Sequence, residues 1–170
     1  MATIGLEIKV PKGWWDEKNV LQELKKTLKK ETGKSILKDF KTTTKGWRRQ
    51  NKKGKKIKPT FKTYFKQGSN EMAVKVSTTD DVYRFVNDGT EARLIFPKKS
   101  ALRFKPGYSA KTKPGSLSSG KASRTGAFMH ATYVRHLGIK PRGFDETILK
   151  RQKMPFAIAV NKAIWRGMTD

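Results

Sequence analysis

Apolar residues stand at every second position at the start of the chain and then change to a helical spacing. From residue 4 to residue 10 every second side chain is Ile, Leu or Val, which predicts a strand with one buried face. From Asp16, a favourable N-cap, to about Lys30 the apolar residues recur every three or four positions, which predicts an amphipathic helix. Gly33 is expected to end this helix as its C′ residue. The same spacing returns at residues 36–40, so a second short helix or a kinked continuation is expected.

The middle of the chain has the pattern of strands, tight turns and one short helix. Residues 61–66 and 72–76 predict two strands joined by a turn. A short helix is predicted after Asp80 or Asp81, either of which can cap it. Gly89 is expected to end this helix because glycine accepts a positive φ at little cost.

Short apolar runs continue in the second half of the chain. Residues 92–96 and 101–104 stand on either side of a polar turn and predict a further hairpin. Residues 127–134 regain the character of a strand. Residues 106–125 are rich in Pro, Gly, Ser and Lys and have almost nothing to bury, which predicts a flexible insertion.

The C-terminal region predicts helices. Asp145 is expected to cap the first of them. Pro155 is expected to end or kink that helix and to open a final one, whose apolar face continues to Gly167 at its end. The whole pattern predicts a single α+β domain over residues 1–170. In it a mostly antiparallel sheet packs against an N-terminal amphipathic helix and a C-terminal helix, with long basic loops at about 45–58 and 106–125.

Charge adds a statement about partners. The 170 residues include 39 Lys and Arg against 14 Asp and Glu, a formal net charge of +25. Residues 45–58 hold eight basic residues and no acidic one, and residues 92–144 hold no Asp or Glu at all. A surplus of this size on one domain points first to nucleic acid, because a polyanion relieves the self-repulsion. The alternative for residues 45–58 is a solvated charge run that serves solubility.

Two groups of basic residues are expected to contact the phosphates of double-stranded DNA. The first group is Arg48, Arg49, Lys52, Lys53, Lys55, Lys56 and Lys58, and the second is Lys105, Lys111, Lys113, Lys121 and Arg124. Contacts of this kind carry no sequence information, so the binding is expected to be indifferent to base sequence.

No constellation typical of catalysis, of a metal site or of a cofactor site is found. The chain has no Cys, and its two histidines, His130 and His136, are too far apart to share a metal ion easily. Phosphate-cradling and nucleophile-elbow motifs are absent from the sequence. We therefore expect no enzymatic activity, no metal and no cofactor. No apolar run approaches the roughly 20 residues of a membrane-spanning helix and the N-terminus lacks a secretion signal, so no membrane partner is expected.

Four short motifs occur in order between an amphipathic N-terminal helix and a C-terminal helix. They are Thr44-Lys45-Gly46-Trp47-Arg48-Arg49, Tyr83-Arg84-Phe85-Val86-Asn87-Asp88-Gly89-Thr90, Leu102-Arg103-Phe104 and His136-Leu137-Gly138-Ile139-Lys140-Pro141-Arg142-Gly143-Phe144. Taken together they resemble the tail-completion, or minor tail component, family of long-tailed bacteriophages, a broad group that includes lambda's minor tail protein Z. This chain has Asn87 where that family commonly has Glu, and Leu137 where it commonly has Pro.

The resemblance implies a structural virion protein at the neck, the junction between head and tail, made in the host bacterial cytoplasm. It implies a homo-oligomeric ring, expected to be a hexamer, between the head connector and the tail terminator or tail tube. The double-stranded DNA genome is then expected to pass through the ring or to rest near it. The residues expected to form a structural corner or a subunit contact are Gly89, His136, Gly138, Arg142 and Phe144.

Three alternatives remain open. A free-standing, sequence-independent nucleic-acid-binding protein explains the charge but not the order of the motifs. A ring whose basic residues meet only acidic surfaces of neighbouring virion proteins also explains the charge. A metal-dependent nuclease needs clustered acidic ligands, which the basic half of the chain lacks.

Overall fold

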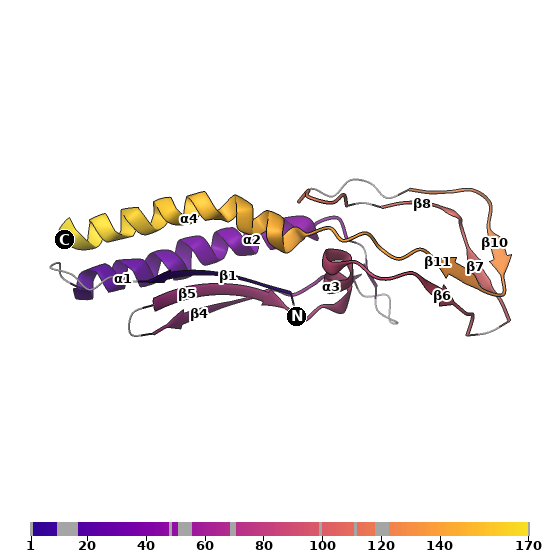
Figure 1. The fold of residues 1–170 in the computed structure, drawn as a ribbon, viewed down its shortest axis with the longest axis horizontal. Helices are drawn as coiled ribbons and strands as arrows, with labels where there is room; N and C mark the ends of the chain where they lie inside the picture. The colour runs from indigo at the N-terminus through magenta and orange to yellow at the C-terminus, as the bar shows by residue number, and fades with distance from the viewer. Residues whose placement is uncertain are drawn as a thin grey trace.

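The computed structural model describes residues 2–9, 17–47, 49–50, 56–68, 71–98, 100–110, 112–117 and 123–169. The predicted α+β class is confirmed, since helices from both ends of the chain accompany antiparallel strands. Figure 1 shows an elongated molecule with two parts. We call the sheet with its helices the body, and we call the paired short strands within residues 93–136 the arm.

The body contains a three-stranded antiparallel sheet in the order β1-β5-β4. Its strands are β1 (Ala2–Lys9), β4 (Lys62–Gln67) and β5 (Glu71–Thr78). The register places Ile4 opposite Val76 and Leu6 opposite Val74, so the buried side chains of both strands lie on one face. The predicted N-terminal strand and the predicted hairpin of residues 61–76 are therefore confirmed.

Three helical segments then run without a break. They are α1 (Glu17–Thr27), the π-helical turn η1 (Leu28–Thr32) and α2 (Gly33–Thr43). The predicted end at Gly33 is wrong, because Gly33 has φ −60° and ψ −39° and the helix continues through it. A Cβ atom on Gly33 would lie 3.0 Å from Cγ2 of Thr63 and 3.3 Å from Cγ2 of Val74. The glycine thus permits a close approach of helix to sheet. The predicted N-cap Asp16 lies outside the described residues.

The C-terminal helix α4 runs from Phe144 to Thr169. The predicted boundary at Pro155 is wrong, because this proline is exposed inside one continuous helix. Ile148 and Ala163, on either side of it, are fully buried, and this packing offsets the backbone hydrogen bond that proline cannot donate. The predicted cap at Asp145 is also wrong. Asp145 lies within the first turn, and its backbone N–H donates to Oδ1 of Asn87 at 3.1 Å.

Helix α4 packs along α1, and both helices lie on the same side of the sheet (Figure 1). Gly167 was expected at the end of the last helix, but it lies inside α4 at the contact with α1. A Cβ atom on Gly167 would lie 2.5 Å from Cα of Val20, so the two backbones touch there. The core between the helices and the sheet contains Ile4, Leu6, Val20, Leu24, Leu28, Ile36, Phe40, Met72, Val74, Val76, Tyr83, Leu117, Phe144, Ile148 and Ala163.

An aromatic cluster closes the end of the body nearest the arm. Tyr83 is fully buried at its centre. Its ring centroid lies 5.3 Å from that of Phe61, 5.8 Å from those of Phe40 and Phe144, and 6.1 Å from that of Trp47. Aromatic rings from four separate segments of the chain thus pack around the ring of Tyr83.

Tyr83 belongs to α3 (Asp81–Asp88), and the predicted caps of this short helix are confirmed. The carboxylate of Asp80 accepts a hydrogen bond from the backbone N–H of Tyr83 at 2.9 Å. Gly89 follows the last helical residue with φ 82°. A Cβ atom on Gly89 would lie 2.6 Å from the carbonyl oxygen of Ile139, so both its conformation and its neighbour require glycine.

The arm is a nested set of two-stranded ribbons. Its strands are β6 (Arg93–Ile95), β7 (Leu102–Phe104), β8 (Gly107–Ser109), β9 (Ser123–Thr125), β10 (Met129–Ala131) and β11 (Val134–His136). Strand β6 pairs with β11, β7 with β10 and β8 with β9. The predicted hairpin between residues 92–96 and 101–104 is wrong, because each of these strands pairs with a returning strand instead. Residues 127–134 do contain strand β10, as predicted.

The segment between β8 and β9 returns to the body (Figure 1). Leu117 is only 8% exposed and belongs to the core, and Thr112 is buried as well. The N–H of Gly115 donates to the carbonyl oxygen of Arg142 at 3.1 Å. The prediction that residues 106–125 have almost nothing to bury is therefore wrong. The other basic segment contains a short hairpin, in which β2 (Arg49–Gln50) pairs with β3 (Lys56–Ile57).

Candidate nucleic-acid interface

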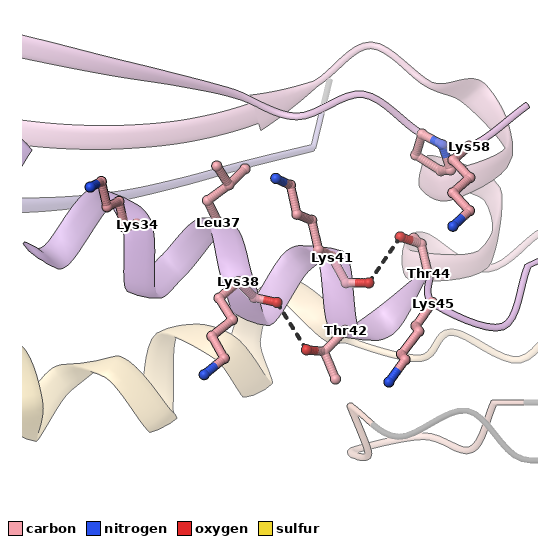
Figure 2. Close-up of a pocket in the computed structure, with 9 residues that line it drawn as sticks. Lys34, Leu37, Lys38, Lys41, Thr42, Thr44, Lys45 and Lys58 are labelled. Carbon is pink, nitrogen blue, oxygen red and sulfur yellow. Dashed lines mark hydrogen bonds between the residues drawn. The ribbon is translucent and has the colours of Figure 1, made fainter. Parts of the chain in front are cut away.

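Five lysines gather around a groove beside α2 (Figure 2). The groove has a volume of about 600 Å³ and is lined by Lys34, Leu37, Lys38, Lys41, Thr42, Thr44, Lys45, Lys58 and Pro59. Helix α2 and the turn that follows it supply one wall, and the segment that leads into β4 supplies Lys58 and Pro59. The groove thus joins two segments of the chain on the body.

The lysine row follows from the helical spacing of α2. Lys34, Lys38 and Lys41 are separated by four and three residues, so they lie on one side of the helix. At 1.5 Å per residue the row extends for about 10 Å. The core side of the same helix holds Ile36 and Phe40, both fully buried, and this packing turns the lysines outward.

Two threonines fix the end of this helix at the groove. The hydroxyl of Thr42 donates to the carbonyl oxygen of Lys38 at 2.9 Å, and that of Thr44 donates to the carbonyl oxygen of Lys41 at 3.3 Å (Figure 2). The backbone N–H of Lys45 then donates to the carbonyl oxygen of Thr42 at 3.3 Å. These bonds hold Lys45 beside the row, although it follows the helical residues.

The positive charge of the groove has no acidic partner among the described residues. In that part of the chain no Asp or Glu lines the groove, and none of its five lysines forms an ion pair. The acidic residue nearest in sequence, Asp39, is buried on the other side of α2. There it accepts a hydrogen bond from Gln152 and pairs with Arg151 at 3.5 Å, both in α4. Lysines near the carbonyl end of a helix are stabilised by its dipole, but their ammonium groups remain free to bind an anion.

Of the first predicted group, Lys58 is exposed and lines the groove. Arg49 and Lys56 lie in the β2–β3 hairpin. Residues outside the described part of the chain are Arg48, Lys52, Lys53 and Lys55. This group therefore meets the groove at one described residue.

Of the second predicted group, Lys105 and Arg124 are exposed in the arm, and Lys113 is exposed in the segment that returns to the body. Lys111 and Lys121 lie outside the described residues. The structure does not bring Lys105 or Arg124 to the groove of α2.

Four groove residues were absent from the predicted contacts, namely Lys34, Lys38, Lys41 and Lys45. Their signal in the sequence is a 4-3-4 spacing of lysines without an intervening acid on that side of the helix. The four lysines do not form a dense basic run, since they are spread over 12 positions of α2 and the turn that follows it.

The arm carries a separate basic and aromatic patch. Phe128 is exposed, the guanidinium carbon of Arg103 lies 4.4 Å from its ring centroid, and the ammonium of Lys105 lies 5.0 Å from it. Cations at this distance from a ring face are attracted by its quadrupole. Lys105 is thus held beside an aromatic side chain.

The predicted corner is an internal junction between α3, the arm and α4. Thr90, which follows Gly89, and Ile139, which follows Gly138, exchange two backbone hydrogen bonds of 3.0 Å. Gly138 has φ 85°, and its N–H donates to Nδ1 of His136 at 3.0 Å. The two bonds between Thr90 and Ile139 join the segment that leads into the arm to the segment that returns from it.

Arg142 and Phe144 complete this junction. The backbone N–H of Arg142 donates to the carbonyl oxygens of Val86 at 3.2 Å and Asn87 at 3.0 Å, and Phe144 is fully buried against Tyr83. Nε of Arg142 is buried without a hydrogen-bond partner among the described residues. The described contacts of the corner are contacts within the chain.

Over the described ranges, no three residues of the types His, Asp and Glu lie close enough together to hold a metal ion. In the same part of the chain no helix is long and apolar enough to cross a membrane.

No protein-family model, no curated protein and no solved structure matches this chain.

Proposed function

We propose that the protein is a structural virion component of the head–tail junction of a long-tailed bacteriophage. In this proposal it assembles as a homo-oligomeric ring, joins the head connector to the tail, and binds the double-stranded DNA genome through the lysine groove. The order of the four motifs supports the phage assignment. The groove is the observation that carries the DNA contact, because five lysines line it and none of its described lining residues is acidic.

The dimensions of the groove suit a phosphate backbone. The row from Lys34 to Lys41 extends for about 10 Å, which is roughly three phosphates along one strand of B-DNA. Lys45 and Lys58 add two further charges beside the row. Each neutralised phosphate contributes about −0.9 to the slope of log affinity against log salt, so full use of the groove corresponds to a slope of roughly −4.5.

The arm supports the oligomeric part of the proposal. Two-stranded ribbons are marginally stable by themselves in water, and this arm exposes Leu94, Phe96, Phe128 and Tyr133. A neighbouring subunit would cover such side chains. A free-standing nucleic-acid-binding protein is the second candidate, and the observation that favours it is that the groove is complete within one chain.

The position of the protein in purified particles tests the proposal. A reconstruction or specific labelling is expected to show the protein as a ring at the neck. Its absence from virions would exclude the structural role. The free-standing DNA-binding protein would then be the function that the groove supports.

A further inference from the structure

Helix α4 is apolar on two opposite sides. Its inner side contributes Ile148, Ala163 and Gly167 to the packed interior. Its outer side carries four large apolar side chains, and these are Met154 (69% exposed), Ile158 (49%), Trp165 (68%) and Met168 (37%). A surface helix normally has a single apolar stripe, which faces the core. The second stripe has no function in the fold described above.

The outer stripe has the spacing of a helix-packing seam. Met154, Ile158, Asn161, Trp165 and Met168 follow one another at intervals of four, three, four and three residues. This 3.5-residue repeat keeps a seam facing a partner helix, and it extends for about 21 Å. Asn161, exposed in the middle of the seam, is of the kind that fixes the register of paired helices.

The edges of the seam are basic. Lys150 precedes Met154 by four residues and Lys162 follows Ile158 by four, so both lie beside the stripe. Arg151 precedes Met154 by three residues, but its guanidinium pairs with Asp39 of α2 at 3.5 Å, so the two lysines carry the charge of the edges. All three are exposed. The acidic residues Asp145 and Glu146 lie in the first turn of α4, before the seam begins.

We propose that this outer stripe docks an amphipathic α-helix of a partner protein, whose apolar seam is flanked by Asp and Glu. The apolar row packs best against a partner helix whose apolar side chains have the same 3.5-residue repeat. The basic edges favour a partner with Asp and Glu beside that repeat. A second copy of α4 would add its own lysines beside the seam and would supply no acidic flank for Lys150 and Lys162, which disfavours self-pairing. A membrane surface is also disfavoured, because the stripe is narrow and has Asn161 at its centre.

A designed peptide tests this docking directly. The probe is a fluorescent three-heptad helix with Leu at its seam positions and Glu on both flanks. Fluorescence anisotropy with the full chain is expected to give a Kd in the micromolar range, as befits a small interface of roughly 1,200 Å² or less. A peptide with Ser in place of Leu and the same Glu residues is expected to bind at least about tenfold more weakly, since it lacks the seam.

Two protein variants test whether the peptide binds at the seam or is attracted by the positive charge of the whole chain. Ile158→Ser with Trp165→Ser is expected to weaken binding of the Leu–Glu peptide by about tenfold or more. Leu94→Ser with Phe96→Ser removes exposed apolar side chains from the arm instead, and is expected to leave the affinity unchanged. Circular dichroism checks that each variant is folded.

Several results would overturn the proposal. These are absence of peptide binding, equal binding of the Ser–Glu peptide, or equal binding by the Ile158→Ser and Trp165→Ser variant. Sedimentation that shows a dimer of the chain dissociated by the same variant would assign the stripe to a second copy. Displacement of the peptide by anionic phospholipid vesicles, lost in that variant, would assign it to a membrane. Replacement of Lys34 and Lys38 by Gln in the groove is expected to leave peptide binding unchanged, so this test is independent of the proposed DNA contact.

Discussion

The hydroxyl of Tyr83 in α3 donates a hydrogen bond to Oδ1 of Asp145 in α4 at 3.2 Å, across 62 residues of sequence. Burial raises the pKa of the Tyr83 hydroxyl above its usual range, and the negative charge of Asp145 raises it further. Burial also raises the pKa of the Asp145 carboxyl, although the bond from Tyr83 opposes this shift. The same pair ties α3 to the first turn of α4, directly after the corner that ends at Phe144.

Removal of the Tyr83 hydroxyl tests the value of this bond. Tyr83→Phe keeps the ring in the aromatic cluster, and we expect it to lower the free energy of unfolding by about 1 kcal/mol. Urea denaturation at neutral pH measures the change. Tyr64→Phe, at an exposed tyrosine in β4, is the control and is expected to change nothing measurable. Equal stability of the Tyr83→Phe variant and the wild type would show that the hydrogen bond to Asp145 does not stabilise the fold.

The raised pKa of Asp145 predicts a pH dependence of stability. Because the folded chain holds this proton more tightly than the unfolded chain, the contribution of Asp145 is most favourable below its unfolded pKa of about 3.9. The contribution declines as the pH rises through the higher folded pKa. Asp145→Asn removes the titration, so its free energy of unfolding is expected to rise relative to wild type as the pH increases across this window.

Urea denaturation between about pH 3.5 and pH 7 checks this sign, since the window begins below the unfolded pKa. Asp81→Asn, which removes one carboxyl at an exposed residue of α3, is the matched control. Parallel curves for wild type and Asp145→Asn would show that the carboxyl does not titrate differently in the folded chain.

The lysine groove predicts a salt-dependent affinity for duplex DNA. Replacement of Lys34, Lys38, Lys41 and Lys45 by Gln is expected to weaken binding and to reduce the slope of log affinity against log salt by up to about 3.6. Filter binding or anisotropy across a salt series, with two unrelated duplex sequences, gives both values. The two sequences are expected to bind alike.

A second variant that also loses four positive charges shows whether DNA affinity depends on the groove or on net charge alone. It carries Gln at four exposed lysines away from the groove, namely Lys9, Lys25, Lys29 and Lys75. We expect this variant to lose distinctly less affinity than the groove variant, because its lysines do not line one groove. An equal loss in both would mean that only the total charge matters.

The close contact between α1 and α4 predicts that one methyl group added at Gly167 lowers the stability of the fold. Gly167→Ala would place a Cβ atom 2.5 Å from Cα of Val20, and backbone atoms cannot give way as a flexible side chain can. We expect the helices to separate and the stability to fall by about 1–3 kcal/mol. Thermal or urea denaturation measures it. Gly5→Ala in β1, where the nearest atom lies at 4.0 Å, is the control, and a similar loss there would refute the explanation.

Local features of this fold could be predicted because they depend on neighbours in sequence. The alternation in β1, the cap at Asp80 and the positive φ at Gly89 each follow from side-chain chemistry within a few residues. The α+β class followed from the same patterns. The motif order supplied a functional hypothesis, which stays a prediction.

Local signals were misleading where tertiary packing opposed them. Gly33 and Pro155 are both common at helix ends, yet both lie inside helices. At Gly33 the reason is the short distance to β4 and β5, and at Pro155 it is the buried packing of α4 on either side. Neither contact can be read from the residues beside the glycine or the proline.

By itself, the sequence determined the periodicity of each element, the caps of α3 and the large positive charge. Only the tertiary structure decided which strands of the arm pair, that Lys58 joins the lysine row of α2, and that Met154, Ile158 and Trp165 remain outside the core. The physical reason is the range of the interactions. Hydrogen bonds within a turn and helical spacing depend on nearby residues, whereas strand pairing and burial depend on which distant segments compete for the same face.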